Sequence, residues 1–451
     1  MRTRRTRSYA VLLVVGCAAL AFGAVALSGS LRAPSFTRSL LGTDDSVSAA
    51  IGDLNGDGRA DIVTANYNPA SVSVGLNRGG GRFEGGDYDV GGLARWIAIG
   101  ELDGDGKPDL VTTLEGEVRS SDIPYGFSVL INTGDGHFSP GRDYETDTKP
   151  SSIAVEDLNA DKRADLAIGL GETVSVLLNR GDGTFLPPVA YTIGSQPRSL
   201  EAGDLNGDAK PDLVAVAGAS ALSVLLNRGD GTFEAKQNYR SGRTPTSIAI
   251  GDLNGDRKPD LAVSNFSGNT VSVLLNRGEG SFESKHDYRT GVAPSSIVSG
   301  DFNGDGTPDL ATANSGPGTV AVLLNRGDGT LRAKLDYVPE FECCGPMTLG
   351  DVNGDRRPDL AVPVGYSRNG STYLSLLINT PGLCNVQNVV GMTRAAAKRT
   401  LAGVSCRVGK VRHADSKGMK RGRVISTKPW FGAVRPKGTK VNLVVSKGRR
   451  R

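Results

Sequence analysis

The chain has 451 residues, among them 61 glycines, 52 Lys or Arg, 48 Asp or Glu, 5 cysteines and 3 histidines. A hydrophobic fraction of only 38% with this much glycine disfavours helix-rich folds, and so few histidines and cysteines disfavour many enzyme mechanisms. Residues 35–382 carry 29 basic against 47 acidic residues (−18), and residues 383–451 carry 18 against 1 (+17). This asymmetry indicates separate units with different partners.

Residues 1–30 are predicted to be an export signal. Arg2, Arg4, Arg5 and Arg7 precede an uncharged run from Ala10 to Leu27. Its length lies between that of a secretory signal, about 7 to 15 residues, and that of a membrane span, about 20. Cleavage after this segment and its retention as a membrane anchor both remain open. In either case the rest of the chain is expected outside the cytoplasm, with membrane contact through this segment alone.

Residues 31–382 contain one nonapeptide repeated seven times, and its copies start 47 to 56 residues apart. The copies are DLNGDGRAD (53–61), ELDGDGKPD (101–109), DLNADKRAD (157–165), DLNGDAKPD (204–212), DLNGDRKPD (252–260), DFNGDGTPD (301–309) and DVNGDRRPD (351–359). Short β-branched runs separated by Gly, Asn, Asp and Pro surround each copy and predict four strands per unit. Four-stranded units of this period predict the blades of a β-propeller, here with seven blades.

The seventh unit lacks the outer strand that follows every earlier unit. The segment SFTRSLL (35–41), which precedes the first unit, is similar to the missing element. An open ring would expose unpaired strand edges. We therefore expect the N-terminal strand to complete the blade whose other strands come from the C-terminal end of the propeller.

The motif D-x-N-G-D-x-x-x-D framed by strands, with N-R-G-D-G-T-F downstream, resembles the FG-GAP/VCBS repeats of integrin-α-like propellers. The resemblance spans roughly 345 residues. It implies a seven-bladed propeller with calcium in its blade loops, and adhesion or carbohydrate recognition as common roles.

The nonapeptides are predicted calcium loops. Acidic or amide side chains at positions 1, 3, 5 and 9 and the carbonyl of position 7 supply only oxygen, as hard cations require. Zinc and copper are disfavoured because no Cys or His takes part, and Mg²⁺ because it needs a stricter octahedron. Up to seven Ca²⁺ are expected. The alternative is that these are polar turns whose side chains cap their own backbone. The expected ligands are Asp53, Asn55, Asp57, Arg59, Asp61, Glu101, Asp103, Asp105, Lys107, Asp109, Asp157, Asn159, Asp161, Arg163, Asp165, Asp204, Asn206, Asp208, Lys210, Asp212, Asp252, Asn254, Asp256, Lys258, Asp260, Asp301, Asn303, Asp305, Thr307, Asp309, Asp351, Asn353, Asp355, Arg357 and Asp359.

Ligand-binding candidates lie in the segments that enter the inner strands and in the loops between second and third strands, on the face opposite the nonapeptides. They are Trp96, Tyr125, Arg198 and Arg243, whose aromatic or guanidinium groups suit sugars; the alternative is ordinary surface loops. The adjacent Cys343 and Cys344 depart from every other unit. Three Arg-Gly-Asp tripeptides fall in a slot that other units fill with RGG, TGD or RGE, which indicates a hairpin turn rather than an adhesion motif.

Residues 383–448 break the repeat and resemble a PASTA domain. The matching elements are NVVGMT (388–393), a helix face from Ala396 to Leu401, VISTKP (424–429) and KGTKVNLVVSKG (437–448). The resemblance implies an α+β fold and association with peptidoglycan. The dense positive charge also suits an anionic wall polymer, through residues 383–451; the alternative is a solvated tail against the acidic propeller. Cys384 and Cys406 flank the first strand and helix, and an exported protein is expected to oxidise such a pair.

The sequence thus predicts an exported, non-catalytic, calcium-binding recognition or adhesion protein of the cell envelope, a monomer that binds no nucleic acid. Its propeller is expected to bind a glycan or protein, and its C-terminal domain the cell wall. The alternative is a secreted carbohydrate-active enzyme with its site on the central face. No catalytic residue is assigned, because the three histidines share no partner pattern and no G-x-S-x-G, H-E-x-x-H or phosphate loop occurs.

Overall fold

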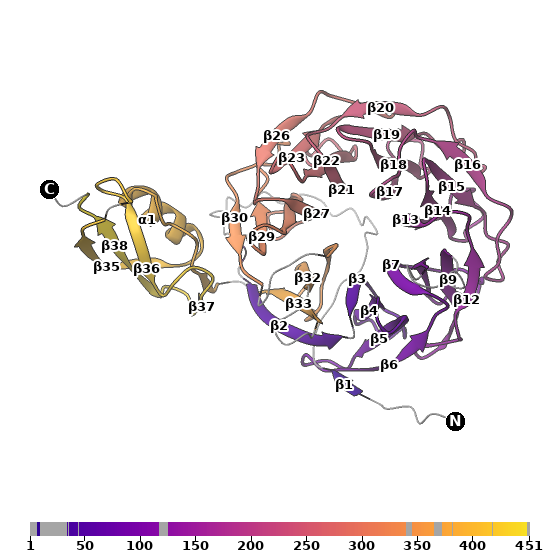
Figure 1. Ribbon diagram of the computed structural model, residues 1–451, viewed down its shortest axis with the longest axis horizontal. Helices are drawn as coiled ribbons and strands as arrows, with labels where there is room; N and C mark the ends of the chain where they lie inside the picture. The colour runs from indigo at the N-terminus through magenta and orange to yellow at the C-terminus, as the bar shows by residue number, and fades with distance from the viewer. Residues whose placement is uncertain are drawn as a thin grey trace.

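The computed structural model describes residues 7–9, 34, 36–43, 45–116, 125–339, 345–364, 372–380, 382–416 and 418–448. The protein is an all-β ring followed by a small α+β domain at its side (Figure 1). Seven sheets of at least four strands form the described ring, and each is one blade. The predicted all-β propeller architecture is confirmed.

Each blade runs outward from the centre of the ring in four antiparallel strands (Figure 1). The innermost strands are β3 (Ser46–Gly52), β7 (Leu93–Gly100), β13 (Pro150–Glu156), β17 (Leu200–Gly203), β21 (Pro245–Gly251), β27 (Pro294–Gly300) and β31 (Thr348–Gly350). The second strands are β4 (Asp61–Asn66), β8 (Asp109–Glu115), β14 (Asp165–Leu170), β18 (Asp212–Ala217), β22 (Asp260–Asn265), β28 (Asp309–Asn314) and β32 (Asp359–Val364). These second strands are almost wholly buried, because both of their faces pack against neighbouring blades.

The third strands are also largely buried, and exposure is greater on the outermost strands. The third strands are β5 (Ser71–Asn77), β9 (Gly126–Leu130), β15 (Thr173–Leu177), β19 (Ala221–Leu225), β23 (Thr270–Leu274), β29 (Thr319–Leu323) and β33 (Thr372–Asn379). The outermost strands are β6 (Phe83–Asp89), β12 (Arg142–Glu145), β16 (Val189–Thr192), β20 (Gln237–Arg240), β26 (His286–Arg289), β30 (Leu335–Tyr337) and β2 (Phe36–Thr43). Small hairpins, β10 (Asn132–Gly134) with β11 (His137–Phe138) and β24 (Asn276–Gly278) with β25 (Ser281–Phe282), precede two of the outermost strands.

The ring closes through the N-terminal strand, as the sequence predicts. β2 pairs antiparallel with β33, from Phe36 opposite Asn379 to Thr43 opposite Thr372. The seventh sheet therefore has the order β2-β33-β32-β31. One apolar cluster joins this blade to the first, since Ile62 and Phe83 pack with Leu374 and Leu376. The fold thus depends on contacts between the two ends of the propeller segment.

The segment predicted to direct export is largely outside the described residues. Its described part, β1 (Arg7–Tyr9), pairs with β6 at the edge of the first blade. Within the described part of the chain, no helix has the length and apolar character needed to cross a membrane. Cys343, Cys344 and most of the insertion in the second unit lie outside the described residues.

The C-terminal domain packs one helix against short strands. Its elements are β34 (Cys384–Asn385), α1 (Arg394–Gly403), β35 (Arg407–Ala414), β36 (Val424–Lys428), β37 (Val434–Arg435) and β38 (Lys440–Ser446). Thr393 begins the helix, because its hydroxyl accepts a hydrogen bond from the Ala396 N–H. Ala397 and Leu401 face one apolar cluster with Val441 and Leu443 of the sheet.

This domain rests directly on the closing blade. The Asn385 side chain donates to the Phe36 carbonyl at 3.1 Å, and Gln387 accepts from the Asp336 N–H at 2.8 Å. Beneath this contact, Phe36 packs edge-on against Tyr337, with ring centroids 4.8 Å apart. Residues 383–448 are therefore a folded domain docked beside β2 and β30 (Figure 1), not a solvated tail.

Candidate functional site

The nonapeptide loops connect the innermost strand of each blade to its second strand, and position 9 is the first residue of that second strand. The loop of the fifth blade is representative. Asp252 accepts hydrogen bonds from the N–H groups of Gly255, Asp256 and Arg257, at 2.7 to 3.1 Å. Asn254 accepts from the Asp256 N–H at 2.9 Å, and Asp256 from the Lys258 N–H at 2.9 Å. The acidic and amide side chains thus hold the loop closed, because their oxygens turn back toward the N–H groups of the loop itself.

Four loops reach this conformation without glycine at position 6. Lys162, Ala209, Arg257 and Arg356 have φ between 64° and 69°, in the left-handed region that glycine normally occupies. Ala160 adopts φ 63° at position 4 of the third loop. Each such residue costs on the order of 1 kcal/mol. The hydrogen bond from the position 6 N–H to the position 1 carboxylate forms both in loops with glycine and in loops without it, so it supports this backbone in either case.

Position 9 is a buried aspartate in every loop. Burial raises its pKa to about 6 in Asp61, Asp109, Asp165, Asp212 and Asp260, and the charges at positions 1, 3 or 5 raise it further. Hydrogen bonds from two backbone N–H groups oppose this effect, for example those from Leu253 and Asn276 to Asp260. In the sixth loop burial raises the pKa of Asp309 to about 8. The Oδ2 atom of Asp309 is buried and has no hydrogen-bond partner among the described residues.

Asn276, whose N–H donates to Asp260, belongs to a set of residues that recurs in every blade and that the sequence analysis does not single out. In every blade a buried asparagine follows the third strand or ends it; we call these seven residues, listed last, the linking asparagines. Each donates its backbone N–H to position 9 of its own loop and its side-chain N–H to the carbonyl of position 2 in the preceding blade. For Asn276 these bonds reach Asp260 at 2.7 Å and Leu205 at 2.9 Å. The set is Asn77, Asn132, Asn179, Asn227, Asn276, Asn325 and Asn379.

The recurrence of Asn in the L-N-R-G motif is the signal that could have found them. Asn77 reaches Val352 of the seventh blade, so the linking asparagines run around the whole ring. They tie each nonapeptide loop both to its own blade and to its neighbour. The loops are therefore part of the contact between blades, not separate surface turns.

The donor set of the loops fits a hard divalent cation. In the second loop, which has aspartate rather than asparagine at position 3, carboxylate oxygens of Glu101, Asp103 and Asp109 lie within 4.8 Å of one another. Oxygen-only donors of this density suit Ca²⁺. The side chains at positions 1, 3, 5 and 9 are the ones able to hold it.

A channel of about 620 Å³ passes between the innermost strands. Of the four predicted ligand-binding residues, Trp96 and Arg198 line this channel. Tyr125 and Arg243 are exposed and are not among its lining residues. The structure therefore brings together two of the four candidates, from the second and fourth blades. Two glutamates that the sequence analysis did not select, Glu156 and Glu201, also line the channel.

The Arg-Gly-Asp tripeptides lie in hairpin turns. In each, the aspartate accepts hydrogen bonds from both the N–H and the hydroxyl of the threonine two residues later, as Asp182 does from Thr184. The three histidines lie in β11, β26 and β35, on different sheets.

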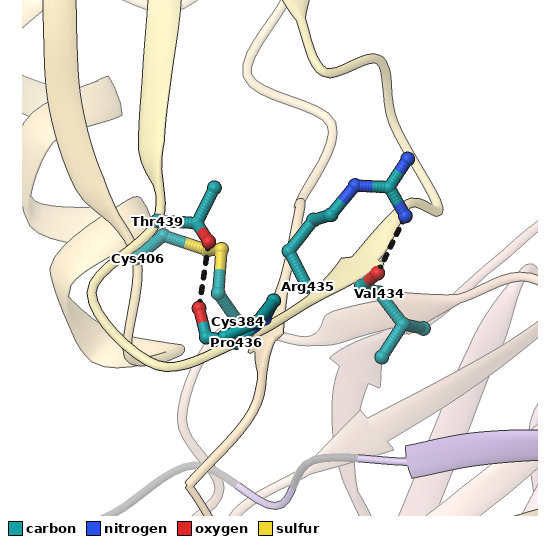
Figure 2. Close-up of a disulfide and its surroundings, with 6 residues drawn as sticks. All are labelled: Cys384, Cys406, Val434, Arg435, Pro436 and Thr439. Carbon is teal, nitrogen blue, oxygen red and sulfur yellow. Dashed lines mark hydrogen bonds between the residues drawn. A yellow bond between two sulfur atoms is a disulfide. The ribbon is translucent and has the colours of Figure 1, made fainter.

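The C-terminal domain contains the predicted disulfide between Cys384 and Cys406 (Figure 2). The bond joins β34 to the residue that precedes β35, and both cysteines belong to the apolar cluster of the domain. Nearby, the Thr439 hydroxyl donates to the Pro436 carbonyl at 2.7 Å and fixes the turn before β38 (Figure 2). On the outside of the domain, Trp430 is 74% exposed and lies between Lys428 and Arg435 in the sequence.

Two family models match this chain, one in the propeller and one in the C-terminal domain. The FG-GAP-like repeat model matches residues 53–112, 102–168, 157–215, 210–263, 252–312 and 301–362, and the PASTA domain model matches residues 385–447. A structure of BBS1N in complex with ARL6DN is 13% identical over 78% of this chain and 98% of that one, with a TM-score of 0.53. A structure of an Agrocybe aegerita lectin that recognises non-reducing terminal N-acetylglucosamine is 22% identical over 65% of this chain and 80% of that one, with a TM-score of 0.48.

Proposed function

Because the chain belongs to the FG-GAP-like repeat family and ends in a PASTA domain, we propose that it is an exported recognition protein of the cell envelope. In this proposal the propeller binds a glycan or protein ligand without catalysis, and the PASTA domain holds the protein to the wall. The observation that carries the proposal is the combination of these two modules in one chain with opposite charge. Residues 35–382 have a net charge of −18, and residues 383–451 have a net charge of +17.

The PASTA domain supplies a surface suited to an anionic wall polymer. The 18 basic residues of residues 383–451 attract polyanions with a strength that falls as salt rises. Trp430 adds an exposed indole, which stacks well on a sugar or peptide surface. Peptidoglycan or an anionic polymer attached to it is therefore the partner that we assign to this domain.

The wall-binding proposal is tested by co-sedimentation of the full chain with purified cell walls. Binding is expected to fall steeply between about 50 and 300 mM salt, and Trp430→Ala to weaken it several-fold. Val390→Ala, which alters another exposed apolar residue of the same domain, is the matched control and should bind normally. Equal sedimentation with and without residues 383–451 would contradict the assignment.

We further propose that Ca²⁺ occupies the nonapeptide loops and stabilises the ring. The cation would be held by positions 1, 3, 5 and 9 and by the carbonyl of position 7, and it would offset the crowded carboxylate charge. Because the linking asparagines connect these loops between blades, binding in a loop stabilises the contact between blades as well. Binding of a ligand to the folded state alone raises its stability.

Calorimetric titration of Ca²⁺ into the chelator-treated chain, with thermal melts before and after, tests this proposal. Several sites and a rise in Tm are expected. Asp252→Asn should remove one site, whereas Glu279→Gln, at an exposed glutamate of the same blade, should remove none. An unchanged melt after chelation, with no heat of binding, would leave the loops as self-capping polar turns.

A secreted carbohydrate-active enzyme is the second candidate. The observation that favours it is Glu201 in the central channel, whose pKa is raised by burial to about 7, in the range useful for a general acid. The test is release of reducing sugar from polysaccharides by the full chain and its loss in Glu201→Gln. Absence of turnover across a polysaccharide panel would exclude this candidate.

A further inference from the structure

The wall of the central channel departs from the repeat at a few positions, and these departures gather in one part of it. Three residues before the nonapeptide, the fourth blade has Glu201. The other blades have small or medium uncharged residues there: Ala50, Ala98, Ala154, Ala249, Val298 and Thr348. Because six blades fold without a carboxylate at this position, the architecture does not need one. Burial raises the pKa of Glu201, so its charge has a cost in the folded protein.

Glu156 is a second departure, in the adjacent third blade. The residue directly before the nonapeptide is glycine in the six other blades. At Gly52 and Gly203 an added Cβ would come within 3.0 and 3.3 Å of an isoleucine of the next inner strand, Ile99 and Ile250. Beside Glu156 the equivalent residue of the next strand is Ala202. Alanine is smaller than these isoleucines and leaves room for the glutamate side chain. Glu156 is therefore a second carboxylate at the channel.

Arg198 differs from its counterpart in the second blade. Arg95 occupies the equivalent position and forms an ion pair with Glu115 at 2.9 Å, where Lys149 also reaches the same carboxylate. Arg198 lines the same channel, but its guanidinium has no acidic partner among the residues that the structure describes. Glu201, three residues further along the same strand, likewise has no basic partner among those residues. The two opposite charges line one cavity and do not neutralise each other.

Trp96 is the third departure. Five other blades have serine at its position, and in three of these the hydroxyl, of Ser199, Ser247 or Ser296, accepts a hydrogen bond from a backbone N–H of the next blade, at 2.9 to 3.3 Å. Tryptophan forgoes this contact between blades and supplies an apolar, aromatic wall to the channel instead. Trp96 makes no such contact and instead lines the cavity, which favours a role in binding.

From these observations we propose that the central channel binds a small zwitterionic ligand, an amino acid or a short peptide with free termini. Its ammonium group lies toward Glu201 and Glu156, and its carboxylate toward Arg198. Trp96 packs against its apolar part. The cavity of about 620 Å³ is within the range of small-molecule sites, about 300 to 1,000 Å³. This inference names a ligand class for the propeller and rests on the proposed recognition function.

The test is isothermal titration calorimetry of the full chain with Ala-Ala, Ala-Lys, Ala-Glu and Ala-Phe, each with free termini and each N-acetylated and C-amidated. At least one free dipeptide is expected to bind with Kd below about 1 mM, and blocking its termini to weaken binding at least tenfold. Glu201→Ala introduces the alanine that four other blades have at this position. Arg198→Ser introduces the serine that two other blades have at the position of Arg198. Both should fold normally and should weaken binding at least tenfold, whereas Arg243→Ser, outside the channel lining, should bind as the parent does.

Failure of all four dipeptides to bind would overturn the channel site, as would binding that is indifferent to both Glu201→Ala and Arg198→Ser. Wall co-sedimentation of the same preparations separates this outcome from failure of the proposed function. A chain that sediments with walls but binds no dipeptide refutes the channel ligand alone. If the chain binds the dipeptide through Glu201 and Arg198 but does not sediment with cell walls, the channel site is supported and the envelope role is refuted.

Discussion

The propeller and the PASTA domain are stabilised by different means. The propeller distributes its apolar contacts over several clusters shared by neighbouring blades, and the linking asparagines repeat one set of hydrogen bonds around the ring. The PASTA domain has a single apolar cluster around one helix, with a disulfide inside it. A ring is stable only if it closes, whereas a domain of about 65 residues has little core to spare and gains from a covalent link.

The largest effect is expected from opening the ring. Deletion of residues 31–41 removes most of β2, exposes the edge of β33 and takes away Phe36, which packs on Tyr337 and lies under the PASTA domain. Tm is expected to fall by more than about 10 °C, or the chain to fail to fold, as circular dichroism melts would show. Deletion of residues 1–30, which removes β1 but keeps β2, should have a much smaller effect. Similar melts for the two deletions would show that closure by β2 is not important.

The disulfide should affect the PASTA domain rather than the ring. It closes a loop of 22 residues, and loss of such a link costs about 3 kcal/mol. Cys384→Ser with Cys406→Ser is expected to lower the transition of this domain in scanning calorimetry and to leave the propeller transition near its parental temperature. The control is the parent protein in a reductant, which should reproduce the double variant. A shared decrease of both transitions would mean that the two modules unfold as one unit.

Replacement of one linking asparagine tests the contact between blades. Asn276→Ala leaves the carbonyls of Leu205 and Pro259 without their donor in a buried place, with an expected loss of about 2 to 3 kcal/mol in the free energy of unfolding. Denaturant titration measures the loss. Asn238→Ala, at an exposed asparagine of the outermost strand β20, should cost less than about 1 kcal/mol. Equal losses would remove the special role of the linking asparagines.

The smallest effect concerns pH and a single channel carboxylate. Burial raises the pKa of Glu201 from 4.5 to about 7, so the folded state binds a proton more tightly than the unfolded state does. The stability that this group contributes is therefore lost as pH rises from about 4.5 to about 7. Glu201→Gln should stabilise the protein by about 1 to 2 kcal/mol at pH 8 and hardly at all at pH 4.5, since the side chain keeps some contact with channel water. Glu172→Gln, at an exposed glutamate, should show no such difference between the two pH values.

Much of the architecture could be predicted because it is written in short-range patterns that repeat. The nonapeptide spacing, the β-branched runs between turns and the missing outer strand of the seventh unit indicated both the propeller and the role of residues 35–41. The closing strand is in fact Phe36–Thr43, two residues longer at its C-terminal end. The cysteine pair of the PASTA domain was predictable because its strand and helix are adjacent in the sequence and because an exported protein oxidises such pairs.

The candidate sites were only partly predictable. Trp96 and Arg198 were selected as separate loop residues, and no local signal showed that they line one channel while Tyr125 and Arg243 do not. Glu201 was not selected because a single acidic residue does not stand out in an acidic propeller. Its position becomes informative only when the inner strands are aligned, because the six other blades have uncharged residues there. The linking asparagines were hidden in the same way, since their partners lie about 70 residues earlier in the chain.

The sequence by itself therefore determined the two modules, their opposite charges, the repeat, the closing strand and the disulfide, because each depends on residue type and spacing along the chain. Only the tertiary structure decided which carbonyl each linking asparagine reaches, where the PASTA domain rests and which charged groups remain unpaired in the channel. Those features depend on distances between blades, and such distances are set by the closure of the whole ring rather than by any segment of it.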